Sequence, residues 1–199
     1  MPNGNPAALA ASTYARDTMY LRYLTYLVLF LACCAVRSGP ARADTTQFTE
    51  TQVKAAYLFN FAKFVEWPAS SFPPVGAPLV IVIIGKVPVG DVYNALNGRS
   101  AKGRRVQVRQ VTRIEEIGAC QILFIANSER GRLREILKSV PALGVLTVSD
   151  IRNFSNLGGM IGLVTRGEKV QFEINIGSAG RAGLKLSSQM LKLALAVYE

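Results

Sequence analysis

Two short apolar runs limit the folds that this chain can adopt. Residues 79–85 read Leu-Val-Ile-Val-Ile-Ile-Gly, and residues 121–126 read Gln-Ile-Leu-Phe-Ile-Ala. Neither run alternates apolar with polar residues, and both contain many β-branched or aromatic side chains. That pattern is typical of strands covered on both faces, as in parallel sheets that carry helices on each side. The chain is therefore expected to form an α/β fold.

Helices are predicted where apolar residues recur at helical spacing, over residues 51–65, 89–96, 128–140 and 183–198. Ser128 and Glu129 are placed to cap and stabilise the third of these helices. Further strands are predicted at residues 105–111, where Val106 and Val108 alternate with polar neighbours, and at residues 144–149.

The last strands differ in pattern from the earlier ones. Residues 160–164 and 169–175 flank Thr165–Glu168 and predict an antiparallel hairpin, with Val170, Phe172 and Ile174 facing the core. Strands that alternate with helices favour parallel pairing in one sheet. We expect an open, mostly parallel sheet flanked by helices, with the antiparallel C-terminal hairpin at one edge.

The first 43 residues have the features of an export signal. Arg16 and Arg22 precede an apolar run over Tyr23–Val36, and Ala41-Arg-Ala43 follows it. A basic region, an apolar core and an A-x-A site describe a cleavable signal peptide, and the run is short for a membrane span. Cleavage after Ala43 would leave residues 44–199 as a single exported domain.

Two alternatives concern this leader. Met19 begins a compact signal by itself, so residues 1–18 can be a start-site artefact. Cys33 or Cys34 could instead be lipidated, although the residues before Cys33 match a lipoprotein signal poorly. Ordinary cleavage at the A-x-A site is favoured.

Composition argues against most enzyme classes. The chain has no histidine, and so lacks the commonest general base and metal ligand. After cleavage Cys120 would be the one cysteine, so the mature chain can form no intramolecular disulfide and no cysteine-rich zinc site. We expect no enzymatic activity, no cofactor and no metal. Cys120 is expected to be buried and inert, with an intermolecular disulfide or a reactive thiol as alternatives.

Basic residues outnumber acidic ones. Loss of the signal removes four basic residues and one acidic residue, and lowers the net charge from +10 to +7. The remaining excess concentrates in Arg99–Arg109 and at Arg130, Arg132 and Arg134. Export makes nucleic acid an improbable partner. A solvated loop and helix face is the expected explanation, and an anionic membrane surface or an acidic partner is the alternative.

Six blocks of the chain resemble one family of periplasmic proteins, the YfiR-like regulators. In order they are Val53–Pro68, Cys120–Ile125, Leu146–Asp150, Gly158–Ile161, Val170–Asn175 and Gly183–Leu193. The resemblance implies an α/β periplasmic regulator without catalytic activity. Such a protein binds the periplasmic sensor region of an inner-membrane diguanylate cyclase and represses it, which lowers cyclic di-GMP and biofilm formation. An outer-membrane lipoprotein that sequesters the regulator would release the cyclase.

The resemblance has one departure. Family members often pair a cysteine at the position of Cys120 with another in the first central strand, but residues 79–85 contain none. A disulfide within this domain is therefore excluded. The family reading makes the loop Asp150–Gly158 a plausible partner-contact region.

Candidate partner-binding residues are Asp150, Phe154, Trp67 and Glu173. Phe154 is expected to be less buried than a core aromatic because its loop is polar, and Trp67 follows the end of the first helix. The other aromatics of that helix are expected in the core, although an aromatic docking face is an alternative. Met190, on the wide apolar stripe of the last helix, could belong to a homodimer interface.

One alternative function comes from the expected architecture. Open α/β sheets bind ligands in crevices outside the carboxyl ends of their strands. The chain could therefore be a periplasmic small-molecule binding module, alone or in addition to a regulatory role.

Overall fold

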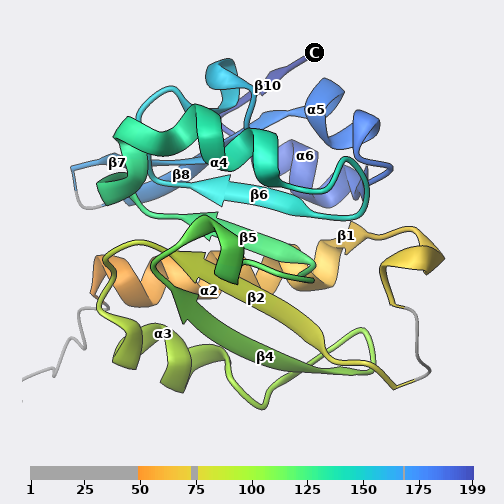
Figure 1. The fold of residues 1–199 in the computed structure, drawn as a ribbon. Coiled ribbons are helices and arrows are strands. Elements are labelled where there is room, and N and C mark those ends of the chain that lie inside the picture. The colour runs from red at the N-terminus through yellow and green to blue at the C-terminus, as the bar shows by residue number, and fades with distance from the viewer. Residues whose placement is uncertain (1–48, 73–75, 168) are drawn as a thin grey trace, which may run out of the picture. The chain divides into compact units, whose positions relative to one another are not determined.

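An eight-stranded sheet organises the part of the chain that the computed structural model describes, residues 49–72, 76–167 and 169–199 (Figure 1). The predicted signal peptide, residues 1–43, lies outside these ranges. In spatial order the strands are β10 (Ala196–Tyr198), β8 (Lys169–Asn175), β7 (Ile161–Arg166), β6 (Leu146–Ser149), β5 (Ile122–Ile125), β2 (Leu79–Ile84), β4 (Arg104–Val111) and β3 (Ser100–Ala101).

Most neighbouring strands of this sheet run parallel, as predicted. β2 pairs in parallel with both β4 and β5, and β5, β6 and β7 continue in the same direction. β7 and β8 form the predicted antiparallel hairpin. The hairpin lies one strand in from the edge, because β10 pairs in parallel with β8 and forms the edge itself. The α/β prediction is confirmed.

Helices cover both faces of the sheet. They are α2 (Glu50–Phe64), α3 (Val89–Leu96), α4 (Leu133–Ser139), α5 (Ile176–Arg181) and α6 (Ser188–Leu193). The strands of the centre are apolar throughout because each face has its own core: Ile81 and Ile83 pack with α2, whereas Val82 and Ile84 pack with α4. α2 and α4 therefore lie on opposite faces (Figure 1).

The N-terminal helix begins and ends at clear local signals. Thr49 and Gln52 form a capping box, in which each side chain accepts a hydrogen bond from the other's backbone N–H. The helix ends at Phe64, because Val65 and Glu66 become strand β1 and pair with β9 (Lys185–Leu186). Within the described ranges, no helix combines the length and the apolar character needed to cross a membrane.

The predicted helix over residues 183–198 is wrong. Gly183 has a left-handed backbone (φ +71°) just after α5, and Leu186 then pairs with Val65 in the small β1–β9 sheet. Ser187 caps the short α6, and the chain extends again as β10. The apolar residues of this segment pack from β9, α6 and β10 separately. Their spacing in the sequence nevertheless resembles the apolar face of one long helix.

The predicted helix over residues 128–140 is only partly present. A 3₁₀ helix, η3 (Asn127–Arg132), precedes α4, and Ser128 does not cap it. Its hydroxyl instead accepts a hydrogen bond from the Lys86 backbone N–H at 2.9 Å. The N-cap prediction is wrong because the loop after the neighbouring strand β2 offers this hydroxyl a competing partner.

Candidate functional site

An apolar groove of about 360 Å³ lies between α2 and α6, and we call it the α2–α6 groove. Its aromatic and aliphatic members come from α2, β8 and α6, and polar side chains occur between them. The lining residues are Tyr57, Asn60, Phe61, Phe64, Phe172, Gln189, Met190, Lys192 and Leu193.

The floor of this groove is a packed aromatic cluster. Tyr57 and Phe61 lie one helical turn apart on α2 with ring centroids 5.9 Å apart, and Phe172 meets them edge-on at 5.4 and 5.3 Å. These are favourable aromatic geometries. The Tyr57 hydroxyl also donates a hydrogen bond to the Val170 carbonyl oxygen at 2.8 Å. The floor is therefore held by both packing and a polar anchor.

The rim contains an exposed leucine. Leu193 ends α6 with 74% of its surface exposed, whereas Met190 is buried. The chain turns away after Leu193 because the Leu195 backbone N–H donates to the Phe172 carbonyl oxygen at 2.8 Å. Leu193, rather than the predicted Met190, is the apolar residue of this helix that a partner can reach. An apolar surface with polar neighbours is typical of a protein interaction site.

Asp150 lies at the carboxyl end of β6 and holds that end to α2. Its Oδ2 accepts a hydrogen bond from Lys54 Nζ at 2.6 Å, and Lys54 also contacts Glu50 at 2.8 Å. Burial lowers the pKa of Lys54, but its hydrogen bonds to Asp150 and Glu50 outweigh that effect and raise it above its ordinary value. The predicted contact residue is thus already engaged in a structural bridge.

Phe154 is buried, with 1% of its surface exposed, so the expectation that its ring is accessible is wrong. The ring belongs to the core on the α4 face, and its 3₁₀ turn, η4 (Phe154–Leu157), is tied to the sheet. Ser155 Oγ donates to the Glu173 carbonyl oxygen at 3.3 Å, and Asn175 Nδ2 donates to the Ser155 carbonyl oxygen at 2.9 Å. The polar residues of the loop make these bonds, which leaves the ring to fill the core.

The other two predicted contact residues are half-buried and lie apart from Asp150. Trp67 Nε1 donates to the backbone oxygen of Gln121 at 3.1 Å, which places it near the amino end of β5. Glu173 lies on β8 opposite Gly162, and its side chain faces away from the α2 core. The four predicted residues therefore do not form one surface.

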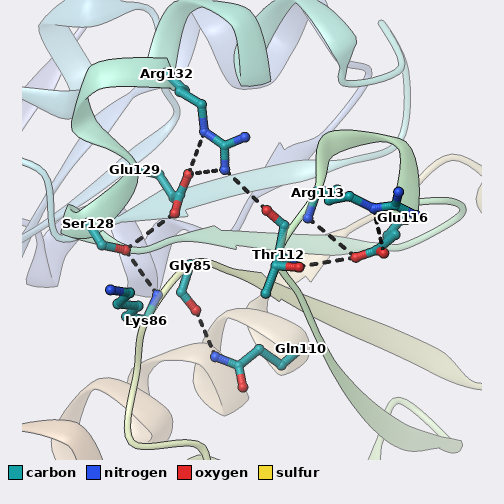
Figure 2. Close-up of polar contacts among 9 residues, drawn as sticks. All are labelled: Gly85, Lys86, Gln110, Thr112, Arg113, Glu116, Ser128, Glu129 and Arg132. Atoms are coloured by element: carbon teal, nitrogen blue, oxygen red, sulfur yellow. Dashed lines mark hydrogen bonds and ion pairs between the residues drawn. The ribbon is translucent and has the colours of Figure 1, made fainter.

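Polar contacts join the loops at the carboxyl ends of β2, β4 and β5 (Figure 2). Ser128, bound to the Lys86 backbone, donates to Glu129 at 3.4 Å, and Arg132 contacts Glu129 and donates to the Thr112 carbonyl oxygen at 3.1 Å. β4 lies on one side of β2 and the next long strand, β5, lies on the other side. The carboxyl ends of the strands at such a switch in strand order form the crevice where open α/β sheets usually bind ligands.

The loops that follow β2 and β5 approach each other closely at Gly85, which leaves little space between them. Gly85 has a left-handed backbone (φ +102°), and a Cβ there would lie 2.6 Å from Ser128 Oγ. On the α2 side of the strand ends a cavity of about 100 Å³ remains, beside Lys54 and Asp150. Pockets for drug-sized ligands usually measure about 300–1,000 Å³. Among the residues that the structure describes, the strand ends thus show a cavity smaller than a drug-sized ligand needs, and this favours the regulator over the alternative of a small-molecule binding module.

Several arginines of the basic run 99–109 serve the fold. Arg99 stacks on the Phe59 ring at 3.8 Å and Arg104 on the Phe72 ring at 4.1 Å. Arg109 donates to the Ile117 carbonyl oxygen at 2.8 Å. These contacts favour a structural explanation for the run over an anionic partner.

We expect the Cys120 thiol to react very slowly in the folded protein. It is buried, with 4% of its surface exposed, and burial, partly opposed by Arg109, raises its pKa to about 11 from the ordinary 9.0. At pH 8 thiolate would be about a hundredfold scarcer than in the unfolded chain. Reaction of a chain of residues 44–199 with Ellman's reagent, with and without denaturant, measures this ratio. Equal rates would contradict the buried position.

The same raised pKa links stability to pH. Because the folded thiol keeps its proton longer than the unfolded one, its contribution is complete below pH 9.0 and declines as pH rises towards about 11. Denaturant unfolding of the wild type and of Cys120→Ala across this interval tests the sign, since the variant should lack that part of the decline.

Comparison with known proteins gives a family match, and the similar solved structures include one distant likeness. The profile of the family described as YfiR/HmsC-like matches residues 51–195. Among solved structures, the ABC domain in complex with L-Trp from Streptococcus pneumonia is similar at 13% identity with a TM-score of 0.46. That likeness covers 60% of this chain and 55% of the other, so the chain spans little more than half of that neighbour's length.

Proposed function

The chain belongs to the YfiR/HmsC-like family, and on that premise we propose that it represses an inner-membrane diguanylate cyclase by binding the cyclase's periplasmic sensor region. At the level of the family, YfiR-like proteins are periplasmic regulators of such cyclases. Repression lowers cyclic di-GMP and biofilm formation. The regulator needs a binding surface and no catalytic group.

The observation that supports this proposal best is the α2–α6 groove. Its floor is held rigid by the Tyr57, Phe61 and Phe172 rings, so little ordering is needed when a partner binds. Leu193 adds an exposed apolar contact at the rim, and Lys192 adds a positive charge beside it. An apolar side chain of the sensor region, flanked by a carboxylate, would fit this combination. Hot spots of interfaces have this form: a desolvated apolar centre with polar surroundings.

Release of the cyclase requires that a second partner cover the α2–α6 groove of the regulator. In this proposal an outer-membrane lipoprotein competes with the cyclase for the regulator, and bound regulator can no longer repress. Asp150, Trp67 and Glu173 remain secondary candidates for these contacts, because each is at most half-buried. Phe154 would act indirectly, by holding the loop that presents Leu157.

Deleting the gene is expected to raise cyclic di-GMP and biofilm, because the cyclase loses its repressor. Wild type and Leu143→Glu should restore repression, whereas Leu193→Glu should not. Leu143 is a matched control: it is 63% exposed, like Leu193, but does not line the groove. Purified Leu193→Glu should bind the sensor region about tenfold more weakly than wild type, as expected for loss of an interface hot spot.

Two results would contradict this proposal. One is unchanged cyclic di-GMP after deletion, with no cyclase recovered by cross-linking in intact cells. The other is equal repression by Leu193→Glu and Leu143→Glu, which would place the contact away from the α2–α6 groove. Circular dichroism of both variants is the control that checks whether either has lost its fold.

A further inference from the structure

A second groove, of about 640 Å³, lies on the opposite side of the sheet from α2. It runs between η3 and α4 on one side and the η4 turn on the other, and we call it the α4 groove. The residues that matter for its chemistry are Arg130, Leu133, Arg134, Leu137, Lys138 and Leu157. It shares no residue with the α2–α6 groove.

One wall of the α4 groove is strongly basic. Arg134 and Lys138 lie about one turn apart on α4, and Arg130 of η3 lines the same groove beside them. All three are exposed, and none pairs with an acid within the described ranges. By contrast Arg132, between them in sequence, is paired with Glu129. The groove lining contains three cations and no carboxylate.

The other wall presents an exposed leucine from a rigid turn. Leu157 has 54% of its surface exposed, although it follows the buried Phe154 by three residues. Asn153 (φ +63°) and Gly158 (φ +96°) bracket the turn with left-handed backbones, and the Leu157 backbone N–H donates to the Asn153 carbonyl oxygen at 3.1 Å. The turn thus holds Leu157 outward, facing the side chains of α4 that line the same groove.

We propose that the α4 groove binds an acidic, amphipathic segment of a partner protein. Carboxylates of that segment pair with Arg130, Arg134 and Lys138, and an apolar side chain covers Leu157 and Leu137. Charge complementarity carries this choice, because three exposed cations beside an apolar contact favour an acidic partner over a neutral or basic one. A concave site also accepts a protruding chain better than a flat anionic bilayer.

Binding at the α4 groove would be a second interaction, separate from the proposed repression of a cyclase. Because the two grooves lie on opposite faces and share no residue, a segment bound at α4 leaves the α2–α6 groove free. The regulator can therefore hold two partners at once, one apolar in character and one acidic.

Fluorescence anisotropy with labelled helical peptides tests the proposal. The main probe carries glutamates on one face and leucines on the other. One comparison peptide replaces its leucines with serine, and another replaces its glutamates with lysine. Vesicles of phosphatidylglycerol, measured by co-sedimentation, serve as the membrane probe. The protein is the mature chain, residues 44–199.

The informative variant is Arg130→Glu/Arg134→Glu/Lys138→Glu. Its matched control is Lys102→Glu/Arg105→Glu/Lys169→Glu, which changes net charge equally at exposed cations outside the groove. We expect the first variant to weaken binding of the acidic amphipathic peptide at least about tenfold, and the control less than about threefold. Leu157→Ser should also weaken it, whereas Leu193→Glu should leave it unchanged.

Each other outcome overturns the proposal. Equal losses in the two triple variants, or equal binding of the serine peptide, would reduce the effect to net charge. Vesicle binding that depends on the three cations, without peptide binding, would assign the surface to the membrane. Absence of binding to any probe would leave the groove without the proposed occupant. Because Leu193→Glu is measured alongside, failure here is distinguishable from failure of the cyclase proposal.

Discussion

Gly159→Ala is expected to destabilise the protein by about 2–3 kcal/mol, the upper part of the range of about 1–3 kcal/mol typical of an overpacked core site. A Cβ on residue 159 would overlap three atoms of the Phe154 ring. The ring cannot move aside, because it is 1% exposed and packed among the residues of the α4-face core. The backbone cannot yield easily either, since the Gly159 N–H donates to the Phe154 carbonyl oxygen at 3.1 Å.

The measurement is urea unfolding of the wild type, Gly159→Ala, Phe154→Ala and the double variant. Phe154→Ala alone should cost about 3–5 kcal/mol, because it leaves a cavity in the core. If the clash is the cause, adding Gly159→Ala to Phe154→Ala should cost little more, and the double-mutant cycle should show a coupling of about 2 kcal/mol.

Gly180→Ala is the matched control for this prediction. Gly180 lies in α5, and nothing stands within 4 Å of a Cβ added there. Alanine should therefore be neutral or slightly stabilising at this site, by up to about 1 kcal/mol. Equal effects of the two glycine substitutions would contradict the close packing of Phe154 on Gly159.

Local pattern was enough to predict the strands of the sheet's centre. Residues 81–84 are completely buried on both faces of the sheet, so every position is apolar. An unbroken apolar run of this length identifies a central strand from the sequence alone. The strand predicted from the alternation of Val106 and Val108 with polar residues is also confirmed, because one face of β4 is buried and the other is exposed. In both cases burial follows directly from the position of a residue along a strand.

The C-terminal segment shows where local pattern fails. Leu184, Met190 and Leu191 match a helical stripe, but they pack from a loop and a short helix. Leu186 and Ala196 are in strands because Val65 and Glu173 offer them backbone partners from distant parts of the chain. Helical spacing contains no information about those partners.

The candidate surfaces could be predicted even less well. Phe154 is expected outside the core because its neighbours are polar, yet the polar neighbour Ser155 hydrogen-bonds to Glu173 and Asn175 of β8. The α2–α6 groove requires Tyr57, Phe172 and Leu193 to meet, and over 100 residues separate the first two. Only the aromatic spacing of α2 pointed towards it, and that spacing equally describes a buried face.

Phe172→Ala is expected to cost about 3–5 kcal/mol of stability, as for other buried phenylalanines. Phe172 is 3% exposed, and its ring contacts both Tyr57 and Phe61 in the floor of the α2–α6 groove. Each aromatic contact adds about 0.5–1.5 kcal/mol beyond the burial of area. Leu193→Ser, on the rim of the same groove, should change stability by less than about 0.5 kcal/mol, because the side chain is 74% exposed.

The contrast between these two variants decides what the groove is for. If Leu193→Ser keeps full stability but no longer binds the sensor region of the proposed cyclase partner, the exposed leucine serves partner binding and not the fold. If Leu193→Ser instead unfolds as readily as Phe172→Ala, the leucine packs in solution and the groove is part of the core. Thermal unfolding and sensor binding, measured on the same preparations together with Leu143→Ser, separate the two outcomes.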